Sequence, residues 1–137
     1  MSDVPRSLAD EVILRARGRC EYCQLSQLGQ EATFHIDHVT PRAAGGPTVS
    51  ENLALACVSC SLRKWAKRTG VDPDSGAEVP LFHPRTDQWS EHFRWDGPFL
   101  VPLSPAGRAT AAALAMNRPM IVTIRQEEML RGRHPPS

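Results

Sequence analysis

Residues 20–23 read Cys-Glu-Tyr-Cys and residues 57–60 read Cys-Val-Ser-Cys, and these two pairs hold all the cysteines of the chain. A Cys-x2-Cys turn offers two thiolates to one ion, and two such turns complete a closed, tetrahedral, four-thiolate zinc site. The duplicated spacing favours this interpretation over a redox pair or unrelated buried thiols. We therefore predict one structural Zn²⁺, whose ligands are Cys20, Cys23, Cys57 and Cys60.

A second pattern lies around the cysteine pairs. In chain order it consists of Asp37-His38, Gly45-Gly46 and Glu51-Asn52-Leu53, followed beyond the second pair by Ser61 and Lys64. Together with the cysteines, this order resembles the zinc-stapled form of the HNH endonuclease family over residues 18–70. The rest of the chain resembles the extension of one group of small bacterial HNH proteins, with Pro-Leu-Phe-His-Pro-Arg and Trp-x2-His-Phe-x-Trp motifs.

The resemblance implies an α+β fold built on a ββα-metal core, stapled by the four-cysteine zinc site. We expect an additional β-hairpin and C-terminal helices outside this core. The chain has 137 residues, a length that suits one domain better than two. The expected organisation is a single domain over residues 1–137, with the core at about 18–70 and the extension at about 71–131.

The resemblance also implies a divalent-metal-dependent endonuclease that hydrolyses phosphodiester bonds in DNA. His38 would activate water, because imidazole exchanges protons near neutral pH. Asp37 would hold the catalytic ion, Mg²⁺ or Mn²⁺ or another divalent cation, through a hard oxygen ligand. Asn52 would orient the histidine through its amide or its backbone carbonyl.

Ser61 departs from the family pattern, which usually has His or Asn at this position as the other metal ligand. A neutral hydroxyl is a weaker ligand, and three interpretations stay open: Ser61 binds the ion directly or through water, a histidine replaces it, or catalysis is lost. His35 is one candidate replacement, because it shares the strand face of Asp37. The others are His83 and His92, from the C-terminal part of the chain.

Two alternatives to a nuclease stay open, and the first of them follows from this departure. The first is a zinc-stabilised DNA-binding module that is catalytically weak or inactive. The second is an interaction protein whose zinc knuckles hold a partner surface. In that case the pattern of Asp37, His38 and Asn52 would be a coincidence.

The net charge of +1, from 16 Lys and Arg against 15 Asp and Glu, argues against a strongly basic nucleic-acid binder. The charges are segregated, however, because residues 61–70 contain four cations and no acid. This segregation predicts DNA contacts by a helix over residues 58–68. The cations expected to make DNA contacts are Arg63, Lys64 and Lys67 on this helix and Arg42 beside the proposed base. For Trp65, stacking on a base is one interpretation, but a place in the core is the expected one.

Local patterns predict the other elements. A capping box at residues 7–10 opens a helix that ends near residue 16. A strand is expected at 32–36, and a short apolar run at 53–56 leads into the second cysteine pair. A loop is expected after Gly70, a hairpin of 89–95 with 99–103, and helices at 105–116 and 119–130, although 120–124 also suits a strand. The apolar stretches are far shorter than the ~18 residues of a membrane span, and the N-terminus carries no secretory h-region. We expect a cytoplasmic protein with DNA as its partner and no membrane, and homodimer formation stays open.

Overall fold

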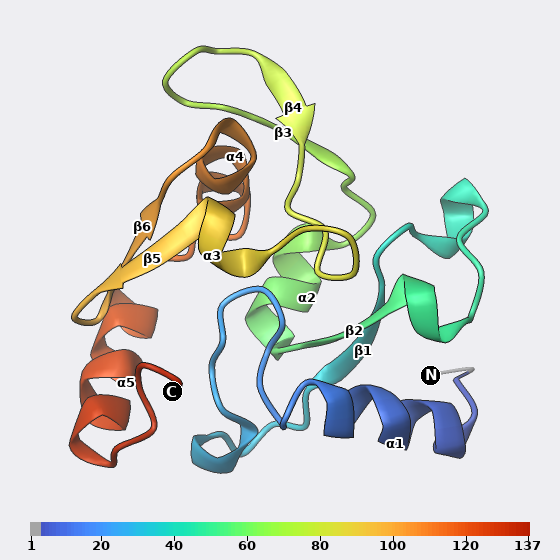
Figure 1. The fold of residues 1–137 in the computed structure, drawn as a ribbon, viewed down its shortest axis with the longest axis horizontal. Helices are drawn as coiled ribbons and strands as arrows, with labels where there is room; N and C mark the ends of the chain where they lie inside the picture. Colours follow the sequence, from blue (N-terminus) through green and yellow to red (C-terminus); the bar gives the residue numbers. More distant parts are fainter. Residues whose placement is uncertain (1–3) are drawn as a thin grey trace. The chain divides into compact units, whose positions relative to one another are not determined.

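The computed structural model describes residues 4–137, which form two compact units (Figure 1). The first unit comprises the described residues up to Ala66 together with His83–Thr86, and the second comprises Lys67–Phe82 and Asp87–Ser137. The described part of the chain contains five α-helices and three two-stranded antiparallel sheets. This mixture of helices and small hairpins confirms the predicted α+β class.

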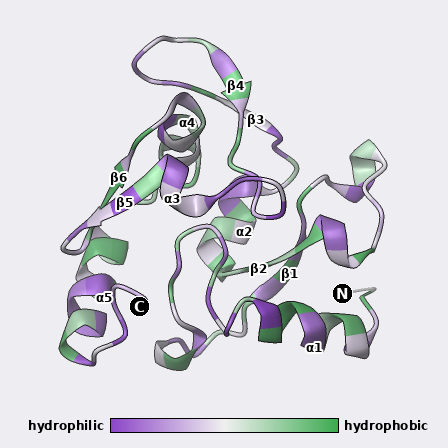
Figure 2. Ribbon diagram, viewed as in Figure 1, coloured by the Kyte–Doolittle hydropathy of each residue, from purple (hydrophilic) through white to green (hydrophobic). Residues whose placement is uncertain are grey.

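The first unit is built in ββα order. Its elements are α1 (Arg6–Arg15), η1 (Gln27–Gly29), β1 (His35–His38), η2 (Arg42–Ala44), η3 (Ser50–Asn52), β2 (Leu53–Ala56) and α2 (Val58–Lys64). β1 and β2 pair antiparallel, with His35 opposite Ala56 and His38 opposite Leu53. All of β2 is buried, whereas β1 carries mainly polar side chains (Figure 2). β1 is therefore the polar strand of this sheet, and β2 is its buried apolar strand.

Small residues on β2 make room for α2 on one face of this sheet. Side chains alternate between the two faces of a strand, so His35 and Asp37 share one face while His38 points to the other. On the first face their partners across the sheet are Ala56 and Ala54. These short side chains let α2 approach closely enough to contact β1. Elsewhere in the unit, α1 packs on β2, and its Val12 is fully buried.

The predicted capping box is wrong, although the helix itself is confirmed. α1 begins at Arg6, directly after the extended Pro5, and has no side-chain cap. The fixed φ of proline suits the residue before a helix, so the chain enters α1 without the serine. α1 ends where Arg17 and Gly18 adopt left-handed φ values of 56° and 68°.

Two further boundaries differ from the prediction. Residues 32–34 lie outside β1, because the Phe34 N–H donates a hydrogen bond to Gln27 Oε1 at 2.7 Å and not to a neighbouring strand. α2 ends at Lys64 and not at residue 68, because Trp65 adopts φ 44° and ψ −117°. No single helix therefore carries all the predicted cations, and Lys67 belongs to the second unit.

The second unit contains two hairpins and three helices. They are β3 (Thr69–Val71), β4 (Glu78–Pro80), α3 (Trp89–His92), β5 (Phe93–Asp96), β6 (Phe99–Pro102), α4 (Pro105–Ala113) and α5 (Pro119–Leu130). The hairpin of β3 and β4 replaces the predicted loop. Its turn is fixed by the fully buried Asp72, whose carboxylate accepts two hydrogen bonds from Arg108 at 2.8 and 2.9 Å. This long-range ion pair leaves no local sequence signal.

The other predicted elements of this unit are confirmed in outline. β5 and β6 form the expected hairpin, although residues 89–92 are helical. Ser104 caps α4 by accepting from the Gly107 N–H at 2.9 Å, but α4 ends at Ala113, before residue 116. α5 has hydrophobic residues at both ends and hydrophilic residues between them (Figure 2). Arg125 of this stretch is buried, donating to the carbonyls of Met116 and Pro98 at 2.6 and 3.0 Å.

No helix among residues 4–137 combines the length and hydropathy that crossing a membrane requires.

Candidate metal centre and active site

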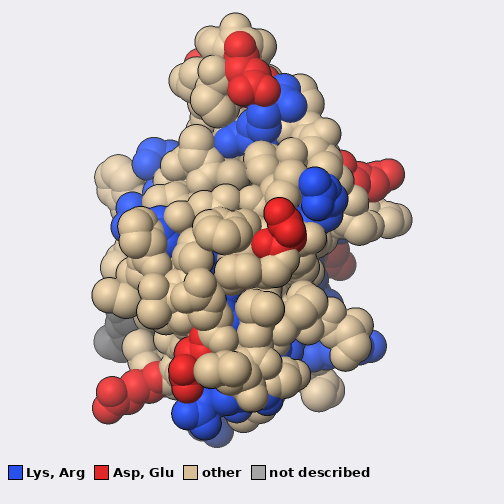
Figure 3. Space-filling view, turned by 90° about the vertical axis from the view of Figure 1, so that its left-hand side faces the viewer, with Lys and Arg blue, Asp and Glu red and all other residues tan. Residues whose placement is uncertain are grey.

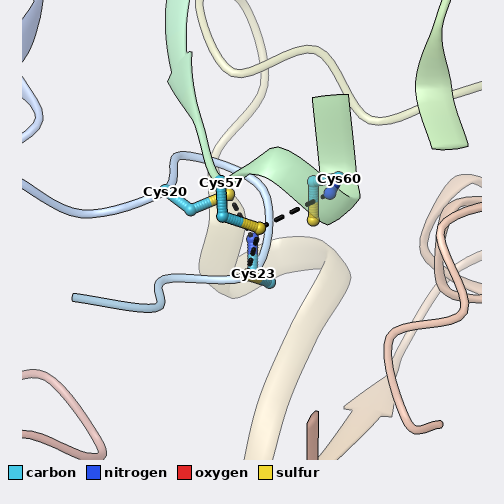
Figure 4. A group of neighbouring side chains, drawn as sticks. All are labelled: Cys20, Cys23, Cys57 and Cys60. Atoms are coloured by element: carbon cyan, nitrogen blue, oxygen red, sulfur yellow. Dashed lines mark hydrogen bonds between the residues drawn. The ribbon is translucent and has the colours of Figure 1, made fainter. Parts of the chain in front are cut away.

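The four cysteines converge on one point of the first unit (Figure 4). Their sulfur atoms all lie within 4.8 Å of one another, and all four residues are buried. The Sγ atoms of Cys23 and Cys57 are 3.7 Å apart. This is close to the ~3.8 Å edge of a tetrahedron with Zn–S bonds of about 2.3 Å, and far beyond the ~2.05 Å of a disulfide. The cysteines are thus free thiols positioned to form a zinc site.

Two loops with the same local geometry deliver these sulfurs. The Cys23 N–H donates to Cys20 Sγ and the Cys60 N–H donates to Cys57 Sγ, each at 3.4 Å. Cys57 follows β2 directly, and Cys60 lies in the first turn of α2. Such amide donors stabilise thiolate charge, as metal binding requires.

The first cysteine loop is also attached to the sheet. The Glu21 N–H donates to the Leu55 carbonyl at 2.8 Å, and the Leu55 N–H donates to Glu21 Oε2 at 2.8 Å. The Arg85 guanidinium donates to the other oxygen of the same carboxylate. A metal at the cysteines would therefore hold this loop, β2 and α2 together.

The chemistry of the sulfur cluster calls for a cation. Burial raises the pKa of the Cys20 thiol well above its usual value, because an apolar site disfavours the thiolate. Four crowded, buried thiolates are stable only when a bound cation compensates their charge. The soft, closed donor set of this structure fits Zn²⁺.

Asp37 lies beneath α2 and is largely buried. Its Oδ2 accepts a hydrogen bond from the Tyr22 hydroxyl at 2.7 Å and is 3.3 Å from Lys64 Nζ. Burial raises the pKa of the Asp37 carboxyl, whereas the Lys64 ammonium and the Tyr22 hydroxyl favour its charged form. Burial also raises the pKa of the Tyr22 hydroxyl well above its usual value, and the neighbouring Asp37 charge adds to this.

Lys64 is buried, contrary to the expectation of a surface cation. Only 2% of its side chain is exposed. Its Nζ donates to the Val39 carbonyl at 3.1 Å in addition to pairing with Asp37. A buried ammonium needs such partners, and the carboxylate on β1 supplies the charge that draws it inward. Lys64 thus positions Asp37 and does not face a ligand.

His38 leaves the sheet on the opposite face from Asp37. Its Nε2 lies 2.9 Å from Thr48 Oγ1, in the loop that connects β1 to β2. A hydrogen bond at one ring nitrogen holds the imidazole in one orientation. Thr48 gives no local sequence signal, because only the fold of this loop brings it to His38.

Asn52 locks the same loop. Its Oδ1 accepts from the Thr40 N–H at 2.8 Å, and its Nδ2 donates to the carbonyls of Thr40 and Pro47 at 3.0 and 2.9 Å. Its backbone carbonyl accepts from the Val39 N–H, next to His38, at 2.9 Å. Gly46 is required here, because a Cβ at this position would lie 1.8 Å from the Thr40 carbonyl oxygen.

Asn52→Ala is expected to lower the free energy of unfolding by about 2–3 kcal/mol, because backbone groups of the loop lose buried partners. Urea denaturation measures this loss. Gln126→Ala removes an exposed amide of α5 and should change the free energy of unfolding by less than ~0.5 kcal/mol. A similar small change in Asn52→Ala would show that its amide does not hold the loop.

Ser61 and His35 meet on the α2 side of the sheet. The Nδ1 of His35 lies 2.9 Å from Ser61 Oγ. The other two candidate histidines have different partners: His83 Nδ1 accepts from the Arg85 N–H at 3.1 Å, and His92 Nδ1 lies 2.6 Å from Ser104 Oγ within the second unit. Of the three histidines, His35 is thus the one in contact with Ser61.

The remaining cations of the prediction lie on the surface. Arg42 in η2 and Arg63 in α2 are exposed, and Arg63 Nε donates to Ser59 Oγ at 3.2 Å. Lys67 is also exposed, in the second unit. On the face drawn in Figure 3, basic and acidic side chains are interspersed, without an extended patch of one sign. Trp65, expected in the core, is instead 78% exposed, because the turn that ends α2 keeps it outside.

Residues 20–67 match the family model described as HNH endonuclease. No curated protein and no solved structure matches the chain.

Proposed function

We propose, because residues 20–67 match the HNH endonuclease family model, that this chain is a divalent-metal-dependent endonuclease acting on DNA. One observation supports the proposal: Asp37 and His38 are neighbours at the end of β1, and each has its own hydrogen-bond partner. Asn52 holds the loop that follows. These hydrogen bonds support Asp37, His38 and Asn52 as the side chains that carry the reaction.

In this proposal His38 takes a proton from the attacking water. The base must be oriented, and Thr48 and the Asn52-locked loop provide the orientation. General-base catalysis of this kind contributes about 10²- to 10⁴-fold in rate. Arg42, exposed shortly after His38 in the chain, neutralises charge on the phosphate, and Arg63 contacts the DNA backbone.

Asp37, with Ser61 and His35, would hold a catalytic Mg²⁺ or Mn²⁺. The donor set fits such an ion chemically, because it combines a carboxylate oxygen, a hydroxyl oxygen and an imidazole nitrogen. When bound, the ion supplies charge stabilisation at the phosphate and the leaving oxygen. The contact of His35 with Ser61 supports His35 as the histidine that compensates for the weak hydroxyl ligand. The pairing of Lys64 with Asp37 keeps the carboxylate in place.

The Zn²⁺ at the four cysteines is structural in this proposal. Four thiolates close the coordination sphere and leave no open position for water or substrate. Its contribution is to hold the first cysteine loop and α2 against the sheet that carries Asp37 and His38.

Plasmid nicking tests the proposal. Purified protein should convert supercoiled DNA to nicked circles with Mg²⁺ or Mn²⁺, and EDTA should stop the conversion. DNA binding without nicking under any divalent ion would overturn the nuclease proposal. That result would favour the zinc-stabilised DNA-binding module, which the hydroxyl ligand Ser61 already makes the second candidate.

Ser61→Asn is expected to raise activity at limiting metal, because a carboxamide oxygen is a better ligand than a neutral hydroxyl. We expect the Mg²⁺ concentration for half-maximal nicking to fall by about tenfold. Ser59→Asn makes the same change earlier in α2 and should leave this concentration unchanged. A loss of activity in Ser61→Asn would show that the pocket is built around serine and its bond to His35.

A further inference from the structure

Among the described Trp, Tyr and Phe residues, Trp65 has the most exposed side chain. It is 78% exposed, and Leu62, three residues earlier on α2, is 68% exposed. The other two tryptophans belong to an aromatic cluster of the second unit, where their ring centroids are 5.4 Å apart. An exposed aromatic ring offers a flat face on which another planar group can stack.

The backbone of Trp65 is unusual as well. A φ of 44° with a ψ of −117° places a bulky residue in a region that such residues rarely occupy. Strained conformations of this kind persist where the surrounding structure imposes them, and they cluster at functional sites. Here the strain ends α2 at a position where a longer helix would continue.

Trp65 lies next to the candidate catalytic centre. Its N–H still donates to the Ser61 carbonyl at 2.9 Å, so its Cα lies four residues, or about 6 Å along the helix axis, beyond Ser61. Ser61 in turn contacts His35. An indole ring at this distance reaches the nucleotide adjacent to a phosphate bound at Ser61 and His35.

The charge around the ring suits nucleic acid. α2 contains no acidic residue, and its exposed cation Arg63 lies two positions before Trp65. Nucleobases stack on aromatic side chains while cations contact the phosphates, and every base offers a π-face to such a ring. An interaction through the patch of Leu62 and Trp65 suits a single base better than a protein interface, which buries about 800 Å² on each partner.

We propose that Trp65 stacks on an unpaired nucleobase beside the phosphodiester that is cleaved, with Leu62 covering the edge of that base. The site therefore binds DNA that offers an accessible base, such as a single strand, a gap or a mismatch. This inference rests on the proposed function only for the place of the cleaved phosphate.

Binding in buffer without added Mg²⁺ or Mn²⁺ tests the proposal without cleavage and leaves the structural zinc in place. The probes are a fluorescein-labelled single-stranded oligonucleotide and an abasic strand of the same length and phosphate number. Wild type should bind the base-bearing strand more tightly. Trp65→Ala should lower its affinity for that strand by about 5- to 100-fold and leave the affinity for the abasic strand unchanged. Trp65→Phe, which keeps a ring, should restore most of the loss.

Leu28→Ala is the matched control, because Leu28 is 84% exposed on η1 and lies outside the proposed site. It should bind both strands like wild type. A second readout does not depend on the alanine variant: tryptophan emission of wild type should be quenched by the base-bearing strand, and Trp65→Phe should lose this quenching.

Two results of the binding experiment would overturn the proposal. An equal loss of affinity for both strands in Trp65→Ala would show a general effect on DNA binding, and an unchanged affinity would mean that the patch serves another partner. The proposed nuclease activity is judged separately. If the protein binds bases through Trp65 but never nicks DNA, this inference holds and the proposed nuclease activity is wrong. If it nicks DNA but its binding does not depend on bases, the nuclease activity holds and this inference is wrong.

Discussion

His38→Ala should reduce plasmid nicking by about 10²- to 10⁴-fold at saturating Mg²⁺, the range expected when a general base is lost. The side chain is partly exposed at the end of β1, and its Nε2 contacts Thr48 in the connecting loop. Removing the imidazole takes away the proton acceptor and leaves the cysteine cluster and the Asp37–Lys64 pair in place. Zinc content and the urea midpoint should therefore stay close to those of wild type.

His134→Ala is the control for this experiment. His134 is an imidazole of the second unit, and its Nε2 lies 2.9 Å from the Gly97 carbonyl oxygen. Its removal should leave nicking unchanged. If His38→Ala nicks DNA at the wild-type rate, His38 is not the base, and the water must be activated by another group.

The sequence predicted the parts of the site that depend on spacing and donor chemistry. Two Cys-x2-Cys turns are typical of a metal site with four thiolate ligands, and the structure brings the four sulfurs together as expected. β2 was also predictable, because a short apolar run between a polar loop and a cysteine turn has to be buried. These features are local, or they follow from the ligand preference of one metal.

Features that depend on long-range contacts were not predictable. Lys64 belongs to a run of surface cations by its sequence, but the carboxylate of Asp37 on the neighbouring strand draws it into the interior. Trp65 was expected in the core because its side chain is large and hydrophobic. Hydrophobicity alone does not reveal the positive φ of Trp65, at which α2 ends. Thr48 and Tyr22 became part of the site only when the fold placed them beside His38 and Asp37.

The ion pair of Lys64 with Asp37 changes the expected DNA interaction. Lys64, one of the four cations within residues 61–70, is buried in its ion pair with Asp37, and Lys67 lies beyond the end of α2. α2 then presents Arg63 as its exposed cation. With fewer phosphate contacts, the affinity should depend less steeply on salt, and the contribution of Trp65 to binding becomes proportionally larger.

The second large effect is expected from the zinc site. Wild type should contain about one zinc ion per chain, and Cys57→Ser combined with Cys60→Ser should lose both the ion and the folded first unit. Zinc binding supplies about 10–16 kcal/mol to small zinc domains, and here the cysteines join the first loop, β2 and α2. The measurements are metal analysis of the purified protein and thermal unfolding with and without EDTA.

Ser59→Ala is the matched variant, because it changes the same turn without touching a sulfur. It should keep the zinc and the unfolding temperature. Low pH should act like EDTA: the thiolates gain protons as the pH falls, burial raises the pKa of Cys20, and the metal is released together with its contribution to stability. A double cysteine variant that retains the wild-type unfolding temperature would show that the apolar contacts of β2 hold the first unit together without the ion. The cysteines would then contribute a metal site but no measurable stability.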